Sequence, residues 1–375
     1  MNFWSYKKEY QLLKKKILKN VDRTLASGSI FFGKELKKFE YNFNKLYKSK
    51  YGLAVGSGTD ALYIALKSFG IGYGDEVITV SNTAIPTAAA ITNTGAKIKF
   101  VDIDNDYLIN PDEIEKKINK KTKAIIAVHL YGQSCHMDKI KKIAKRNKLI
   151  IIEDCAQAQG ATYKKKYVGT LGDAGCFSFY PTKILGAYGD GGFITVKSKK
   201  IFEKMKRIRF YGIESENKKN RFYQKYYSNE HGINSRIDEL HLSILNLKLL
   251  KVNNFIKKRI KIAKYYNNQL KNSGLLLPNV KKNNKHVYHL YTVYHKERVE
   301  IFKKLMKFGI KLNIYYPYPI HKMKSYNNLK FYKKLKLSKT ENLSKGIFSL
   351  PLYPDISVAK LKKITYALKS VLKSI

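Results

Sequence analysis

Residues 177–194 read "FSFYPTKILGAYGDGGFI" and give the first constraint on the fold. An apolar run typical of a buried strand leads to Lys183, and a glycine-rich turn then returns the chain into a second apolar run. Lysine is normally a surface residue, so a lysine enclosed between two such runs raises a chemical question. Lys183 is therefore a candidate reactive amine.

Short apolar runs alternate with lysine-rich helical segments on both sides of this stretch. The expected strands lie in 51–55, 75–80, 98–103, 123–132, 149–157, 175–180 and 191–196, and the expected helices in 58–70, 85–95 and 137–148. This alternation, with runs of Val, Ile and Phe, is typical of a mostly parallel sheet covered on both faces. The sequence thus predicts a large α/β domain.

The pattern changes after residue 232. Leucines and isoleucines recur at three- and four-residue spacing through 235–270, which predicts a long helical connector. The remainder contains a predicted helix around 299–309 and a last amphipathic helix from Val358, typical of a smaller α+β unit. We expect a large domain over 1–250, including the N-terminal segment and the connector, and a small C-terminal domain over 251–375.

Composition excludes some classes of protein. The formal net charge is +45, but only eight of the 73 basic residues are arginine, and the lysines are spread over the whole chain rather than gathered in a patch. No apolar run reaches the roughly 18 residues of a membrane span, and the N-terminus lacks a signal-peptide pattern. We expect a cytoplasmic protein that binds neither nucleic acid nor membrane, with three reduced core cysteines and no metal.

Three stretches together suggest a chemistry. "VGSGTDAL" (55–62) places glycines before a helix, where backbone N–H groups bind anions. Asp154 ends an apolar strand, where α/β proteins bind ligands, and it needs a cationic partner. Taken singly, these features also fit a common glycine turn, a helix cap and a surface lysine. Together with Lys183 they supply what pyridoxal phosphate chemistry requires: an anion cradle, a carboxylate for a ring nitrogen, and an amine for a Schiff base.

The order and spacing of these stretches resemble the sugar aminotransferases of the DegT/DnrJ/EryC1/StrS family, which have the aspartate aminotransferase fold (fold type I). The resemblance runs from about Phe31 to Leu249. It includes "FFGKELKKFE", "GSGTDAL", "GYGDEVI", "TKAIIAVHLYGQ", "EDCAQAQGA", "GDAGCFSFYPTKILGAYGDGG" and "GINSRIDELHLSIL".

The resemblance implies a role for each matching residue. Lys183 would form the Schiff base with pyridoxal 5'-phosphate, Asp154 would pair with its pyridine nitrogen, and Gln157 would approach its ring hydroxyl. The phosphate would be held by Gly58, Thr59 and Ser178, and by Asn234 from a neighbouring subunit. Because Asn234 would come from a neighbouring subunit, the resemblance also implies a homodimer with shared active sites.

The resemblance also implies a substrate. L-glutamate would donate its amino group to a nucleotide-linked keto sugar, most specifically a dTDP-3-keto-6-deoxyhexose, giving a dTDP-3-amino-3,6-dideoxyhexose for a surface glycan. Relatives that aminate C4 often carry "H-x-T-x-G-E-G-G" after the lysine, whereas this chain has "KILGAYGDGG", so C4 amination of a UDP- or dTDP-4-keto-6-deoxy sugar is the alternative. His321 and Tyr316 are candidates for sugar contacts, and Arg209 and Lys225 for the pyrophosphate.

Two departures from the family pattern concern the cofactor. Many relatives have an aromatic residue at the position of Ala84, where it stacks on the ring, and a histidine at the position of Gln159. Two rival classes also stay open from the residues alone. Relatives that dehydrate sugars replace the lysine with histidine, which Lys183 argues against, and a noncatalytic, nucleic-acid-binding protein would leave Asp154, Gln157 and Lys183 without a role.

Overall fold

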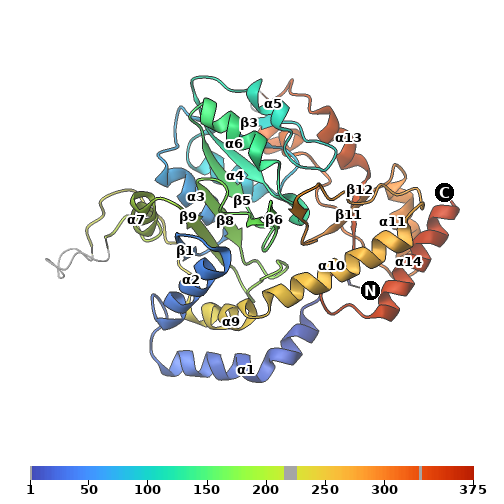
Figure 1. Ribbon diagram of the computed structural model, residues 1–375, viewed down its shortest axis with the longest axis horizontal. Coiled ribbons are helices and arrows are strands. Elements are labelled where there is room, and N and C mark those ends of the chain that lie inside the picture. The colour runs from blue at the N-terminus through green and yellow to red at the C-terminus, as the bar shows by residue number, and fades with distance from the viewer. Residues whose placement is uncertain (1, 215–225, 329–331) are drawn as a thin grey trace.

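The main sheet confirms the predicted α/β architecture. In the computed structural model, which describes residues 2–214, 226–328 and 332–375, seven strands pair in the order β1-β9-β8-β5-β4-β2-β3 (Figure 1). They are β1 (Tyr51–Val55), β2 (Glu76–Val80), β3 (Lys97–Val101), β4 (Thr122–Val128), β5 (Ile150–Asp154), β8 (Ala174–Ser178) and β9 (Gly192–Val196). The pairings from β3 through β8 are parallel, whereas β9 is antiparallel to both β8 and β1.

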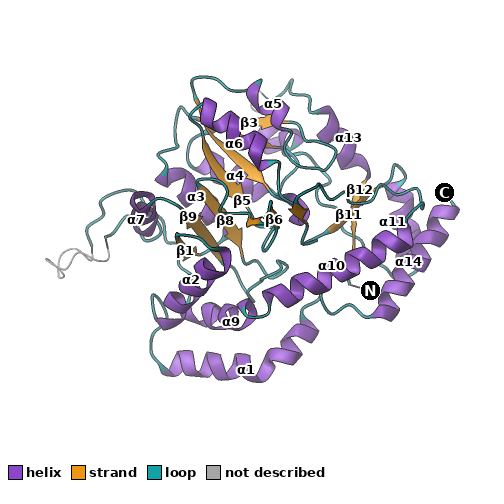
Figure 2. Ribbon diagram, in the orientation of Figure 1, coloured by secondary structure: helices purple, strands orange, loops and turns teal. Residues whose placement is uncertain are grey.

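Helices cover this sheet, as its nearly continuous apolar strands require. They are α2 (Lys34–Tyr47), α3 (Gly58–Ser68), α4 (Ile85–Asn93), α5 (Pro111–Glu115), α6 (Met137–Arg146) and α7 (Lys199–Ile208). Helix α3 packs against β8 and β9, α2 against β1, and α6 against β5 (Figure 2). The short elements η1 (Leu130–Gly132), β6 (Thr162–Tyr163) and β7 (Lys166–Tyr167) lie in the connections, where β6 pairs with β7 and with β10 (Asn284–Lys285).

The predicted connector consists of two helices rather than one. Helix α9 (Glu239–Leu249) packs against α2 and against the N-terminal helix α1 (Lys7–Ala26), whereas α10 (Val252–Leu270) packs against the C-terminal helix α14 (Val358–Lys373). The chain changes direction at residues 250–251 because the two halves pack against different partners (Figure 1).

A second hydrophobic core lies beyond the connector. It is built from α10, α14, α11 (Arg298–Lys307) and the antiparallel pair β11 (Tyr291–Tyr294) and β12 (Ile347–Leu350). The segment between α11 and β12 contains η2 (Ile320–Lys322), α12 (Lys324–Asn327) and α13 (Ser338–Gly346). Ile310 and Leu312 at its start belong to the second core, whereas Ile320, Tyr326, Tyr332 and Leu337 pack into the main core. The boundary at residue 250 stays a prediction, since this segment ties the C-terminal part to the large domain.

The parallel strands place their carboxyl ends at one edge of the sheet. At that edge β2 is followed by residues 81–84, β4 by η1, β5 ends at Asp154, and β8 ends at Ser178. Ligands of α/β proteins bind at such an edge. Within the described ranges, no helix combines the length and the apolar character needed to cross a bilayer.

Candidate active site

Asp154 is held at the end of β5 by two hydrogen bonds. The Thr87 hydroxyl donates to Oδ2 at 2.8 Å, and the Ala156 backbone N–H donates to Oδ1 at 3.1 Å. The side chain is almost fully buried, with 6% of its surface exposed. A carboxylate can accept about four hydrogen bonds, so Asp154 keeps capacity for a cationic partner.

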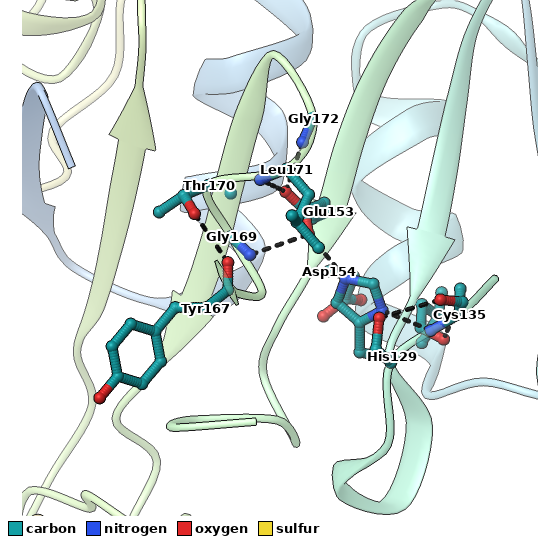
Figure 3. A network of polar contacts seen from close by, with 12 residues as sticks. His129, Cys135, Glu153, Asp154, Tyr167, Gly169, Thr170, Leu171 and Gly172 are labelled. Atoms are coloured by element: carbon teal, nitrogen blue, oxygen red, sulfur yellow. Dashed lines mark hydrogen bonds and ion pairs between the residues drawn. The ribbon is translucent and has the colours of Figure 1, made fainter. Parts of the chain in front are cut away.

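Glu153, the preceding residue, lies in a saturated network. Its carboxylate accepts hydrogen bonds from His129 Nε2 and from the backbone N–H groups of Gly169, Leu171 and Gly172 (Figure 3). Burial by itself raises the pKa of Glu153, but these donors, led by His129, outweigh it and lower the pKa below the usual value. The Glu153–His129 pair thus connects β4, β5 and the turn at residues 169–172, next to the active-site edge of the sheet.

The same network contains a group with metal-ligating side chains. His129, Glu153 and Cys155 place ligand atoms within 4.8 Å of one another, all buried. However, His129 Nδ1 accepts the N–H of Cys135 at 3.0 Å, so the proton of the neutral ring lies on Nε2 and points at Glu153. Burial raises the pKa of the Cys155 thiol, which disfavours the thiolate that binds metals. His129 and Glu153 already use their ligand atoms in hydrogen bonds, so we interpret the cluster as structural.

Lys183 lies in the loop between β8 and β9, near Asp154. The loop is closed at its base by a hydrogen bond from Phe179 N–H to the carbonyl of Gly191, and Ala187 N–H donates to the carbonyl of Phe179. Desolvation lowers the pKa of Lys183 to about 8, although the Asp154 carboxylate opposes this shift. A fraction of the amine is therefore neutral near physiological pH, as a nucleophilic lysine requires.

Gln159, in the turn after β5, braces the same loop. Its amide nitrogen donates to the carbonyls of Ser178 and Leu185, and its oxygen accepts the Leu185 N–H at 2.7 Å. The sequence identified Gln159 only as a departure from the family's histidine. In the structure it holds both ends of the segment that carries Lys183.

The start of α3 and the end of β8 form a close-packed cradle. A Cβ added to Gly58 would lie 2.6 Å from Cβ of Ser178, so only glycine lets the helix N-terminus approach this closely. The Ser57 side chain caps the helix by accepting the Asp60 N–H, and Thr59 occupies its first turn. The N-terminal N–H groups and the Ser178 hydroxyl therefore lie at one place, as phosphate binding requires.

Gln157 connects the large domain to the C-terminal segment. Its oxygen accepts the N–H of Tyr131 at 2.9 Å, and its amide nitrogen donates to the Tyr316 hydroxyl at 2.9 Å. Burial and the nearby Asp154 raise the pKa of Tyr316, so the phenol stays protonated. Tyr316 thus lies at the candidate site, beside Asp154 and Gln157.

Two other predicted contacts already have protein partners. The buried His321 ring bonds Ser81 Oγ through Nδ1 at 2.7 Å and Glu341 through Nε2 at 3.0 Å. Arg209 Nη1 donates to Glu40 and to the carbonyl of Ala54. These interactions anchor the 320–322 turn and α2, so binding of substrate by either side chain stays a prediction.

The remaining predicted positions are less informative. Asn234 is exposed, and its oxygen accepts a hydrogen bond from Arg236. Ala84 is the N-cap of α4 and brings no ring to the site. Lys225 lies outside the described residues.

The comparisons with known proteins agree with this geometry. The profile of the DegT/DnrJ/EryC1/StrS aminotransferase family matches residues 11–369. The chain belongs to this family. It is 40% identical over 375 residues to the dTDP-3-amino-3,4,6-trideoxy-alpha-D-glucose transaminase of Micromonospora megalomicea subsp. nigra, covering 98% of each chain. It is 41% identical over 354 residues to the dTDP-3-amino-3,6-dideoxy-alpha-D-galactopyranose transaminase of Aneurinibacillus thermoaerophilus, covering 94% of each.

A similar solved structure contains a bound cofactor. NtdA of Bacillus subtilis, with bound PMP, superposes with a TM-score of 0.89 at 32% identity, covering 96% of this chain and 82% of that one. The predicted aspartate aminotransferase fold, the aminotransferase activity on nucleotide-linked sugars and the use of pyridoxal phosphate are thereby confirmed. The residues present fit this cofactor, since the glycine-lined cradle, the buried carboxylate and the lysine of lowered pKa lie together.

Proposed function

We propose that the enzyme transfers the amino group of L-glutamate to C3 of a dTDP-3-keto-6-deoxyhexose, giving a dTDP-3-amino-3,6-dideoxyhexose for a surface glycan. The names of the two relatives support the sugar position and the nucleotide, since both are transaminases of dTDP-3-amino sugars. The placement of Lys183 beside Asp154 at the strand ends carries the chemical part of the proposal.

Each residue of the site has a defined task in this proposal. Pyridoxal phosphate, when bound, supplies the electron sink that allows an amino group to be transferred from a carbon of the donor to a carbon of the acceptor. Lys183 Nζ holds the cofactor and then takes and returns the proton at the reacting carbon, a step typically worth ~10²- to 10⁴-fold in rate. Asp154 keeps the cofactor's ring nitrogen protonated. Gly58, Thr59 and Ser178 hold the phosphate through N–H and hydroxyl groups.

Gln157 and Tyr316 complete the floor of the site in this account. Gln157 would hold the ring hydroxyl of the cofactor. Tyr316, whose hydroxyl accepts a hydrogen bond from Gln157, would contact the sugar. His321 supports the segment that carries Tyr316 through its bonds to Ser81 and Glu341.

The product position can be tested directly. The enzyme is incubated with L-glutamate and, in separate reactions, with the 3-keto and 4-keto dTDP-6-deoxy sugars, and the new nitrogen is located by NMR. We expect an amine at C3. An amine at C4, with the 3-keto sugar unchanged, would favour the alternative C4 aminotransferase and leave the family assignment intact.

The proposed homodimer shares its active sites through Asn234. The exposure of this side chain supports the proposal, because a residue that reaches a neighbouring subunit must lie at the surface. Mixed dimers of Lys183→Ala and Asn234→Ala subunits should recover activity at one of their two sites. No recovery, together with a monomeric mass in sedimentation, would contradict shared sites.

A further inference from the structure

Two threonine hydroxyls form a chain behind Asp154. The Thr83 and Thr87 hydroxyl oxygens are 3.0 Å apart, and Thr87 reaches Asp154 Oδ2 at 2.8 Å. Thr83 follows β2, and Thr87 lies in the first turn of α4, where its N–H bonds the carbonyl of Ala84. Both threonines are buried, with 2% and 1% of their surfaces exposed.

The chain has a fixed direction. An ionised carboxylate only accepts hydrogen bonds, and a threonine hydroxyl has a single hydrogen to donate. The hydrogen of Thr87 is therefore directed to Asp154, and Thr83 must donate to Thr87. The bonds run from Thr83 to Thr87 to Asp154.

We infer that Thr87, oriented by Thr83, is a positioning residue for the cofactor of this enzyme. Its hydroxyl fixes Oδ2 while the Ala156 N–H fixes Oδ1, so the two donors together set the plane of the Asp154 carboxylate. The remaining lone pairs then point in fixed directions for the ring nitrogen. The inference rests on the role proposed above for Asp154.

A buried threonine whose hydroxyl only forms a structural hydrogen bond would not affect cofactor binding when it is replaced. Thr79 offers the matched case, because it is fully buried in β2 and its hydroxyl donates to the carbonyl of Ile126 at 3.1 Å. Thr79→Val and Thr87→Val each remove one buried hydroxyl at nearly constant shape. Only Thr87→Val removes a donor from the carboxylate.

The test measures cofactor affinity rather than turnover. Cofactor-free protein is titrated with pyridoxal 5'-phosphate, and Kd is read from the absorbance of the bound cofactor. Thr87→Val should raise Kd by about tenfold or more, as expected for loss of a hydrogen bond to a charged group. Thr87→Ser, which keeps the hydroxyl, and the control Thr79→Val should stay within about threefold of wild type.

Further variants separate this inference from the role of Asp154. Thr83→Val should raise Kd by a smaller factor than Thr87→Val, because it only frees the Thr87 hydroxyl. Equal Kd values for Thr87→Val and Thr79→Val would overturn the inference, as would failure of Thr87→Ser to restore affinity. If Asp154→Asn itself leaves Kd unchanged, the proposed role of Asp154 fails; if only Asp154→Asn raises Kd, the positioning role of Thr87 alone fails.

Discussion

Glu153 and Asp154 are adjacent carboxylates on β5 whose side chains point to opposite faces of the sheet. Glu153 accepts hydrogen bonds from His129, Gly169, Leu171 and Gly172, which fills its capacity. Among the described residues, Asp154 accepts hydrogen bonds only from the Thr87 hydroxyl and the Ala156 N–H. The contrast shows that a buried carboxylate with every lone pair used stabilises the fold, whereas one with unused capacity beside a lysine can bind a cationic group.

The largest expected effect comes from changing the carboxylate with unused capacity. Asp154→Asn removes the negative charge that we assign to the ring nitrogen, so kcat/KM should fall by about 10²- to 10³-fold. The free energy of unfolding of the cofactor-free protein should change by less than about 1 kcal/mol, because a neutral amide costs less to bury. Steady-state kinetics measures kcat/KM, and urea unfolding measures the free energy of unfolding. Unchanged kinetics would remove Asp154 from the chemistry.

Glu153→Gln should reduce stability and leave cofactor binding nearly unchanged, the reverse of what we expect for Asp154→Asn. The new amide group would face the N–H of Gly169 and the His129 ring, so we expect a loss of about 3 kcal/mol in the free energy of unfolding. The pKa of Glu153 is lowered below 4.5, so its stabilising contribution is present above that pH and is lost as pH falls through the folded-state pKa. The difference between wild type and variant should therefore shrink in acid.

Urea unfolding of both proteins between pH 7 and pH 3 measures this difference. At neutral pH and low temperature, the folded variant should keep cofactor affinity within about threefold of wild type. Stability equal to wild type at pH 7 would show that the saturated network does not hold the fold.

The smallest expected effect is a pH dependence of stability caused by Lys183, which lies near Asp154. Its pKa is lowered from 10.5 to about 8, so between these values the unfolded chain binds more protons than the folded protein, and stability rises with pH. Relative to Lys183→Met, the free energy of unfolding of cofactor-free wild type should rise by about 1 to 2 kcal/mol from pH 8 to pH 10.5. This is less than the full pKa shift implies, because the Lys183 side chain is partly exposed. Parallel curves for the two proteins would contradict the lowered pKa.

The sequence predicted the parts of this molecule that depend on periodicity and chain order. Alternating apolar runs predicted the parallel sheet, and Asp154 was predicted at a strand end because hydrophobicity stops there. The break between α9 and α10 was not predicted, since both halves have the same helical pattern and only their packing partners differ.

The supporting residues of the site could not be read from the sequence. Thr87 and Gln159 act through hydrogen bonds to segments distant along the chain, and nothing in local composition marks such partners. The signal closest to Thr87 was its position just after the predicted strand 75–80, in "SNTAIPT". His321 shows the converse, because a motif residue expected near the sugar has both ring nitrogens bound to protein groups.

The most direct test of the account is to locate the lysine that carries the cofactor. Borohydride reduction of the holoenzyme makes the link permanent, and peptide mapping by mass spectrometry identifies the modified residue, with Lys183→Ala as the control. Burial also lowers the pKa of Lys197, Lys248 and Lys285, so the chain offers other reactive amines. The account predicts one modified peptide, containing Lys183, and none in the control. Modification at another lysine, or none in wild type, would contradict it.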